Sequence, residues 1–367
     1  MTRNPSFAAR VIAWQRRHGR HDLPWQNTRD PYRLWVSEIM LQQTQVTAVI
    51  GYYARFMERF PDVVSLAQVP EEEVMRCWAG LGYYSRARNL HKAARMIVNQ
   101  WKGSLPQTPE ALASLPGIGR STAAAIAVFA HGARAAILDG NVKRVFARCF
   151  GVDGYPGQKK VEEALWERAT GLLPRTGIEA YTQGLMDLGA TLCTRSRPDC
   201  GACPLQGQCV AHRDKRVGEL PRRKPKKALP HKTCVMLVMQ SGREVLLEKR
   251  PSSGIWGGLW CLPQFDTETA ARCWAQDAGA VWSGRTKLAC IEHGFTHYDL
   301  TIYPVVIKMR GGGKNSHAAT ASAMPRGTWL ALDECAGAAL PAPVKKLLVH
   351  LAHARHSDNR STTVPRP

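Results

Sequence analysis

Long apolar runs and acidic residues are both scarce in this sequence. No apolar stretch approaches the roughly 18 residues that a membrane-spanning helix needs, which argues against a protein embedded in a membrane. Only 29 Asp and Glu oppose 50 Lys and Arg, and the formal net charge is +21. Basic side chains that meet phosphates release condensed counterions, so this charge predicts nucleic acid as the partner.

The N-terminus carries no clear secretion signal. Five Arg precede the first acid, Asp22, but Arg10 interrupts any apolar signal core, and Phe7, Val11 and Trp14 recur at helical spacing. We therefore expect a first helix rather than an organellar presequence, and a cytoplasmic, nucleoid-associated protein of bacterial type. Eleven Cys without a signal peptide indicate a reducing compartment in which some thiols bind metal.

The pattern of the chain changes once, near its middle. Residues 1–210 show helical spacing and no convincing alternation of period two. Residues 211–232 contain nine Lys or Arg, two acids and three Pro, which predicts a basic linker. Residues 233–352 contain aliphatic runs at 233–240 and 244–248 around a Ser-Gly-Arg turn, a looser alternation at 298–307 and a helical pattern at 336–350. We expect residues 353–367 to be a frayed tail.

Four cysteines gather within 17 residues, at Cys193, Cys200, Cys203 and Cys209. Their thiolates can converge on one centre, because Gly and Pro residues turn the chain between them. Zinc held by four Cys usually uses two short C-x-x-C pairs, and the unequal spacing here suits a cubane iron–sulphur cluster better. The spacing alone leaves both open.

A glycine-containing connection lies between two helical segments at residues 115–122. The first helix is predicted to begin with Thr108 as its N-cap and Pro109 at its first position. Gly117 and Gly119 let the backbone approach a phosphate, and the next helix aims its free N–H groups at that position. The segment predicts a DNA contact, although it also fits a plain helix–turn–helix connection.

Two carboxyl groups stand in unlike sequence contexts. Glu38 lies in an almost wholly apolar helix, where burial would raise its pKa and keep it protonated, as a general acid requires. Asp139 is predicted to be the N-cap of the helix that follows, which would keep it ionised. Such a pair can break a glycosidic bond. Each could also be structural, as a solvated Glu and a simple cap.

Together these features resemble the adenine DNA glycosylases of the MutY family, within the helix-hairpin-helix glycosylase superfamily. The most telling stretches are VSEIMLQQTQV (36–46), GLGYYSRARNLH (80–91), LPGIGRSTA (115–123), LDGNVKRV (138–145) and the four-Cys loop. The resemblance implies a multidomain protein. An all-α helix-hairpin-helix part of six-helix type, with a [4Fe-4S] cluster loop, precedes an α+β Nudix-like domain.

The resemblance also implies roles for single residues. Glu38 would protonate adenine, and Asp139 would stabilise the sugar cation, as an anion or through a transient covalent bond. Gln43 and Tyr83 would wedge the duplex open while adenine is flipped out. Ser121 stands where the lyase relatives carry Lys, so base removal without efficient strand cleavage follows. Lys143 is a neighbour that could supply weak lyase activity, although it fits a lysine on the helix surface better.

The C-terminal part, residues 233–352, resembles the family's Nudix-like domain, and Trp256–Trp260 resembles the start of that domain's motif. Residues 263–282 lack the Glu run that binds magnesium in true Nudix hydrolases, which implies recognition without hydrolysis. Phe295, Thr296 and His297 match a Phe-Ser-His loop with which the family detects 8-oxoguanine. Thr in place of Ser keeps the hydroxyl and adds a methyl group.

The expected partner is double-stranded DNA with adenine opposite 8-oxoguanine or guanine, bound by a monomer. Three other functions fit parts of the sequence. An endonuclease III-like glycosylase-lyase is opposed by Ser121, and a non-catalytic DNA-binding protein would need neither Glu38 nor Asp139. A magnesium-dependent nucleotide hydrolase is opposed by the missing Glu run.

Overall fold

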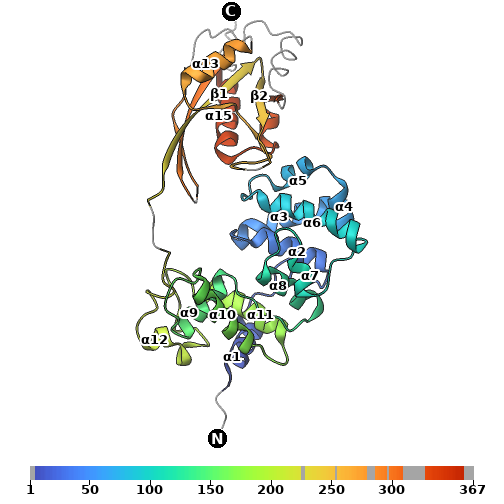
Figure 1. Cartoon of the computed structure of the whole chain (residues 1–367), viewed down its shortest axis with the longest axis vertical. Helices are drawn as coiled ribbons and strands as arrows, with labels where there is room; N and C mark the ends of the chain where they lie inside the picture. Colours follow the sequence, from blue (N-terminus) through green and yellow to red (C-terminus); the bar gives the residue numbers. More distant parts are fainter. Residues whose placement is uncertain are drawn as a thin grey trace, which may run out of the picture. The chain divides into compact units, whose positions relative to one another are not determined.

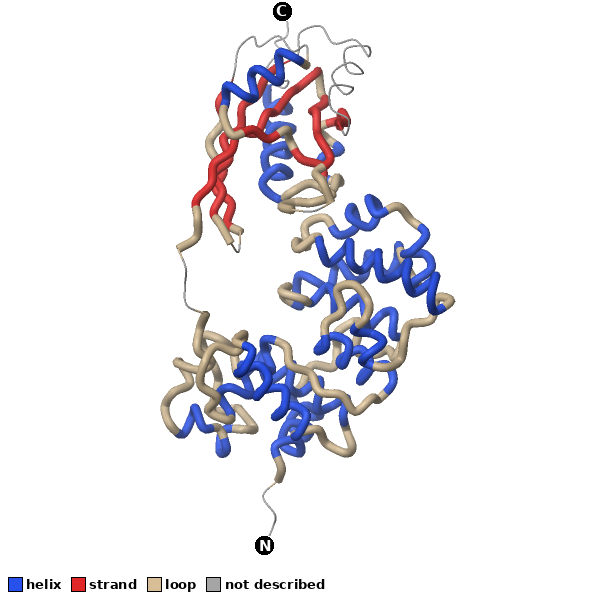
Figure 2. Tube along the Cα trace, viewed as in Figure 1, coloured by secondary structure: helices blue, strands red, loops and turns tan. Residues whose placement is uncertain are grey.

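The computed structural model describes residues 5–224, 228–252, 254–278, 286–295, 297–308 and 327–358. Contacts divide the chain into two compact units (Figure 1). The helical unit contains residues 1–69 and 86–226, and the sheet unit contains residues 70–85 and 227–367. In Figure 2 the strands belong to the sheet unit and the helical unit is drawn in helices and loops. No helix among the described residues has the length and apolar character needed to cross a bilayer.

Short helices joined by tight turns build the helical unit. Its main helices are α1 (Phe7–His18), α2 (Pro31–Leu41), α3 (Val46–Arg59), α4 (Val63–Gln68), α6 (Ser85–Trp101), α7 (Pro109–Ala113), α8 (Arg120–His131), α9 (Gly140–Cys149), α10 (Lys159–Gly171) and α11 (Ile178–Asp187). A π-helical turn (Leu188–Leu192), a 3₁₀ turn (Gln206–Gln208) and α12 (Val210–Arg213) follow. The predicted start of α7 is confirmed, because the Thr108 side chain accepts a hydrogen bond from Ala111 N and Pro109 occupies the first turn.

One close helix contact places α1 beside α11. Gly184 lies on α11, where an added Cβ would come within 2.7 Å of Val11 Cγ1 on α1. The two helices share an apolar core with α8, α9 and α10 that includes Phe7, Val11 and Phe146. Without a side chain at position 184 the backbones can approach, which brings the segment after α1 next to α11.

The predicted linker is partly folded onto the helical unit. Ala211 and Leu220 are buried, and the Arg148 guanidinium donates to the Leu220 carbonyl oxygen at 2.8 Å. Arg216 pairs with Asp153. The basic composition of residues 211–232 suggested a solvated spacer, but apolar Ala211 and Leu220 attach its first half to the protein.

The sheet unit is built on a mixed sheet whose path is β3–β2–β1–β7–β5. Its strands are β1 (His231–Ser241), β2 (Glu244–Lys249), β3 (Trp260–Cys261), β4 (Gln264–Phe265), β5 (Thr286–Lys287), β6 (Ile291–Gly294), β7 (Asp299–Lys308) and β8 (Gly327–Ala331). The predicted hairpin is confirmed as β1 and β2, which pair antiparallel. At the centre β1 pairs in parallel with β7, from His231 opposite Asp299 to Gln240 opposite Lys308.

Alternate residues of β1 enter two different cores. Met236 and Val238 pack with Val344 and Leu348 of α15 (Ala342–Asp358). Leu237 packs on the other side with Ala271 of α13 (Glu268–Asp277). From Cys234 onward the strand is therefore buried on both faces, which explains its continuous apolar run from Cys234 to Met239. Helix α15 runs to Asp358, beyond position 352 where the sequence predicted the domain to end.

Residues 70–85 belong to the sheet unit by their contacts, although the sequence gives them a helical pattern like their neighbours. They include helix α5 (Glu71–Trp78). The Glu72 carboxylate accepts hydrogen bonds from Trp260 Nε1 at 2.6 Å and Lys249 Nζ at 3.0 Å. The hydrogen bond from Trp260 is the main cause that lowers the pKa of Glu72, and Lys249 adds to it. Sequence patterns did not predict this association, because it joins residues far apart in the chain.

Candidate active site and DNA-contact residues

Helix α2 carries Glu38 through the interior of the helical unit. The helix begins where the Asp30 side chain accepts from Tyr32 N at 2.9 Å and Pro31 fixes the first turn. At the other end Arg86 is buried and donates to the carbonyl oxygens of Ile39 and Met40 at 3.0 and 2.7 Å. Both ends are therefore held by hydrogen bonds, which fixes the position of Glu38.

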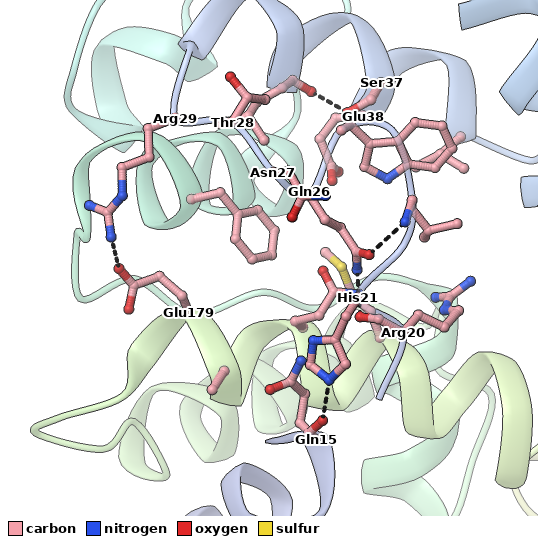
Figure 3. A pocket seen from close by; sticks show the side chains of 18 of the residues that line it. Gln15, Arg20, His21, Gln26, Asn27, Thr28, Arg29, Ser37, Glu38 and Glu179 are labelled. Carbon is pink, nitrogen blue, oxygen red and sulfur yellow. Dashed lines mark hydrogen bonds and ion pairs between the residues drawn. The ribbon is translucent and has the colours of Figure 1, made fainter. Parts of the chain in front are cut away.

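Glu38 borders a cavity of about 480 Å³. Figure 3 shows its carboxyl group pointing from α2 into this cavity. The walls come mainly from α1 and the segment after it and from α2, α8 and α11, and they include Arg20, Gln26, Phe129 and Gln183. The volume is within the range of small-ligand pockets, and the mixed apolar and polar lining could take a purine base.

The surroundings of Glu38 make it a proton donor near neutral pH. Burial, together with the smaller effect of the Asp139 charge, raises its pKa to about 8. The side chain is still partly accessible, because the cavity reaches it. This is the protonation behaviour that the apolar sequence of α2 predicts.

Asp139 is the N-cap of α9, as the sequence predicts: its Oδ1 accepts from Val142 N at 2.7 Å. The causes that act on its pKa are not only those that the sequence suggests. Burial raises the pKa of Asp139, and the hydrogen bonds from Val142 and Asn141 and the charges of Arg144 and Lys143 only oppose that rise. The cap and the neighbouring cations favour the ionised form that the sequence predicts, whereas burial, which the sequence did not reveal, is the largest single cause and acts in the opposite direction.

The glycine hairpin reaches the segment that carries Asp139. Ser121 Oγ accepts a hydrogen bond from Leu138 N at 2.9 Å, one residue before Asp139. Gly117 has a φ of 81°, and a Cβ there would lie 2.9 Å from Asn89 Cβ. Gly119 precedes α8 without a side-chain cap, so the first N–H groups of that helix stay available for a phosphate.

Gln43 and Tyr83 share an unusual backbone conformation. Their φ angles are 58° and 48°, in the left-handed region that costs a non-glycine residue about 1–3 kcal/mol. Gln43 follows α2 and is exposed, and Arg86 donates to the neighbouring Thr44 Oγ1 at 3.1 Å. Tyr83 is 47% exposed. Residues held in such conformations gather at functional sites.

The four predicted metal-binding thiols border one small pocket. Cys193, Cys200, Cys203 and Cys209 line it together with Arg148. Among the described residues, no three His, Cys, Asp or Glu side chains come close enough to hold a single metal ion. Four thiols around one pocket match the donor set of a cubane cluster, whose ligands stand further apart than those of a single ion because the cluster itself is larger.

Basic groups and a fifth cysteine adjoin this pocket. Arg148 is buried and donates to Cys193 Sγ at 3.4 Å and to the Thr194 carbonyl oxygen at 2.7 Å. The thiol of Cys149, which lies outside the predicted set of four, hydrogen-bonds to Cys209. This bond is the main cause that lowers the pKa of Cys209 to about 6. A thiolate is the form that binds iron.

Part of the predicted lesion-reading loop is described. Phe295 packs against Trp256, with ring centroids 5.4 Å apart, and its N–H donates to the Tyr298 carbonyl oxygen. His297 is exposed at the turn that follows β6. Thr296 lies outside the described residues. The loop is therefore anchored on the core of the sheet unit by Phe295 and presents His297 at the surface.

This combination of a helical unit with a glycine hairpin and a sheet unit with a Nudix-like arrangement matches known families. Residues 36–170 match the model of the HhH-GPD superfamily of base excision DNA repair proteins, and residues 234–350 match the NUDIX domain. A solved thermostable thymine-DNA glycosylase shares the helical fold, with a TM-score of 0.52 and 31% identity over 57% of this chain and 95% of that one. The expected fold class is confirmed.

Curated relatives narrow the class to one enzyme. An adenine DNA glycosylase of Buchnera aphidicola (subspecies Acyrthosiphon pisum) is 35% identical over 93% of this chain and 96% of its own length. One from Homo sapiens is 32% identical over 93% of this chain and 73% of its own length. The chain belongs to the adenine DNA glycosylase family, the MutY-like enzymes, and is a DNA-repair hydrolase of N-glycosyl bonds.

Proposed function

We propose that this enzyme removes adenine mispaired with 8-oxoguanine or guanine in double-stranded DNA, acting as a monomer and without efficient strand cleavage. The observation that carries the chemistry is Glu38. Its carboxyl group borders a base-sized cavity in the helical unit, and its surroundings raise its pKa to about 8. A neutral carboxylic acid facing a bound base can donate a proton to it.

The proton would go to the imidazole ring of the flipped adenine. Adenine is a poor leaving group until it is protonated there. The bond between the sugar and the base then breaks, and its electron pair leaves with the protonated adenine. The sugar becomes an oxocarbenium ion, which the Asp139 carboxylate stabilises before water adds to the sugar carbon. In this proposal Asp139 is the ionised member of the pair, and its charge is the second cause, after burial, of the raised pKa of Glu38.

We assign phosphate binding to exposed backbone groups, and base flipping to two side chains that wedge the duplex open. Gly117 and Gly119, with the start of α8, would bind a phosphate, while Gln43 and Tyr83 would enter the base stack. Support comes from the left-handed conformations of both wedge residues and from the uncapped start of α8. Ser121 offers no amine for attack on the sugar, which supports base removal without a Schiff base.

Recognition of the opposite base is assigned to the sheet unit. Phe295, Thr296 and His297 would contact 8-oxoguanine. Support comes from the anchored Phe295 ring and the exposed His297 imidazole. The parts of the sheet unit that face this loop carry a packed apolar core, which suits a rigid platform for reading a base.

Cys193, Cys200, Cys203 and Cys209 would hold a [4Fe-4S] cluster. When bound, it would fix the loop and the basic side chains beside it, a structural role. The purified protein should be brown and contain about four irons per chain, as measured by iron analysis together with the visible absorption spectrum. A colourless protein with one zinc per chain would contradict the assignment.

The central experiment measures adenine release from an A:8-oxoguanine duplex. One half of each sample is treated with alkali, which cleaves abasic sites, and the other half is not. We expect strand breaks mainly after alkali, because base removal alone leaves the backbone intact. Equal cleavage without alkali would contradict a monofunctional enzyme, and no base release at all would contradict the proposed substrate.

A further inference from the structure

Asp187 is a buried carboxylate that the proposed mechanism does not use. It is the last residue of α11 and has no exposed surface. Its Oδ1 accepts from Arg20 Nε at 2.7 Å, from Arg20 NH2 at 2.6 Å and from Gln183 Nε2 at 2.9 Å. Its Oδ2 accepts from the Arg20 backbone N–H at 2.9 Å. Four donors on one buried carboxylate form a fixed network, because removing any of them would leave a buried charge under-satisfied.

The chain makes room for this network with a glycine. A Cβ at Gly19 would lie 2.6 Å from the Gln15 carbonyl oxygen and 3.1 Å from Asp187 Oδ2. The segment between α1 and α2 can therefore approach the end of α11 only if position 19 has no side chain. The approach brings Arg20 onto Asp187.

The network stands behind the wall of the cavity that contains Glu38. Arg20 and Gln183 line that cavity, whereas Asp187 does not. Asp187 must therefore act on a bound base through its partners. Its effect on Gln183 is directional: a carboxylate paired with Arg20 can only accept, so the Gln183 amide must turn its NH₂ group to Asp187.

The orientation of this amide decides what Gln183 can offer a base. No residue in the described part of the chain donates to Gln183 Oε1, and this oxygen is the group that the locked amide leaves for a ligand. A carbonyl oxygen accepts a hydrogen bond from an exocyclic amino group, which adenine has. It repels an exocyclic carbonyl group, which hypoxanthine has at the same ring position.

We infer that Asp187 is a positioning residue that locks the Gln183 amide with its oxygen toward the cavity, so that the cavity selects bases with an exocyclic amino group. The inference rests on the proposed function, in which a purine base enters the Glu38 cavity. It adds the residue that sets the choice between amino and carbonyl purines.

The test is Asp187→Asn in the full-length enzyme. The Asn side chain can turn its own NH₂ group toward Gln183, which lets the Gln183 amide flip and present its NH₂ group to the cavity. Single-turnover excision rates are measured for adenine and for hypoxanthine, each opposite the same base. We expect the adenine-to-hypoxanthine rate ratio to fall by about tenfold or more. Equal slowing of both bases would mean a merely structural role and would overturn the inference.

A double-mutant cycle with Gln183→Met shows whether Asp187 acts through Gln183. This variant keeps the side-chain length and removes the oxygen, so it should lower the same ratio by itself, and Asp187→Asn added to it should cause no further change. If Asp187→Asn fails to fold, as judged by its thermal melt, an unchanged ratio in Gln183→Met still overturns the inference, because Asp187 is inferred to act through Gln183.

The matched control is Asp153→Asn. It also removes a carboxylate paired with an arginine, Arg216, at a position that does not line the cavity, so its ratio should equal that of the wild type. A wild-type enzyme that excises neither base would contradict the proposed function and not the role of Asp187. The two failures are thus distinguishable.

Discussion

The helical unit and the sheet unit bury different kinds of side chain. Among the described residues, every buried charged side chain lies in the helical unit: Arg86, Arg148 and Asp187. The sheet unit buries apolar residues on both faces of β1, with a few neutral polar groups. Burying a charge is costly unless it is hydrogen-bonded, and each of these three side chains is held by several hydrogen bonds. The buried polar groups of the sheet unit are neutral and lie on its strands.

Glu38→Gln should have the largest effect, because it removes the acid from the unit that carries the chemistry. Excision of adenine should fall by at least 10²-fold, while binding to an uncleaved duplex should be nearly unchanged, since Gln has almost the same shape. Single-turnover rates and a binding titration measure the two. Glu163→Gln, the same change on the exposed side of α10, is the control. Near wild-type excision by Glu38→Gln would remove Glu38 from the mechanism.

The pH dependence of excision should follow the raised pKa of Glu38. The protonated form acts, so the single-turnover rate should be steady below about pH 8 and fall above it, as Glu38 loses its proton. At acid pH the rate should fall again when Asp139 takes up a proton, and this should occur above the usual range of an aspartate, because burial raises its pKa.

Asp139→Asn sharpens this pH test. The variant should be severely impaired in excision, because the sugar oxocarbenium ion loses the carboxylate that stabilises it. Its residual rate should fall at a lower pH than in the wild type, because the charge of Asp139 helps to raise the pKa of Glu38. If the rate at alkaline pH fell at the same pH in the variant as in the wild type, the two carboxyl groups would not be electrostatically coupled.

Ser121→Lys should change the reaction type rather than abolish the reaction. It places an amine where the lyase relatives have theirs, so borohydride should trap more protein–DNA adduct than with the wild type. The same change removes the acceptor for Leu138 N, beside Asp139, so excision should also slow several-fold. Ser121→Ala separates the two effects, since it should slow excision without any rise in trapping.

Lys143 is the residue to test if the wild-type enzyme also forms an adduct that borohydride traps. Its Nζ pairs with Glu162 at 2.7 Å, which holds the amine on that carboxylate and away from attack on the sugar. Lys143→Gln should therefore leave the small trapping signal unchanged. No increase in trapping with Ser121→Lys would mean that position 121 does not face the sugar.

His297→Ala should have the smallest effect and should change only the preference for the base opposite adenine. One lost hydrogen bond is worth roughly 1–3 kcal/mol, or about a five- to 150-fold drop in the preference for A:8-oxoguanine over A:G duplexes at one salt concentration. Adenine removal opposite guanine should persist. His350→Ala, another exposed histidine of the sheet unit, is the control.

Deletion of residues 227–367 is the stronger version of the same test. It keeps Leu220, which Arg148 binds, and should weaken excision while removing most of the preference for 8-oxoguanine. If the preference survived both changes, the lesion would be read by the helical unit, and the division of labour between the units would be wrong.

Local sequence patterns correctly predicted those structural features that are set by residues close together in the chain. The cap at Thr108, the cap at Asp139, the hairpin of β1 and β2 and the parts of the fold class are all confirmed. Turn, cap and periodicity signals reach only a few residues along the chain, and each of these features is set within that reach.

Features that depend on distant residues were missed. Asp187 binds Arg20 across the fold, Cys149 meets Cys209, and residues 70–85 associate with the sheet unit. The burial of Asp139, which raises its pKa, was missed for the same reason, since burial is set by the packing of the whole helical unit. The roles of the proposed site residues remain predictions.

The parallel pairing of β1 with β7 also has a consequence for synthesis of the protein. Residue 231 finds its central partner at residue 299, so the ribosome must deliver almost the whole sheet before its core can close. A chain that stops between β2 and β7 would expose β1 as a long apolar edge, the kind of strand that templates aggregation. Premature stop codons in this interval should therefore deplete the protein more severely than a stop placed ahead of β1.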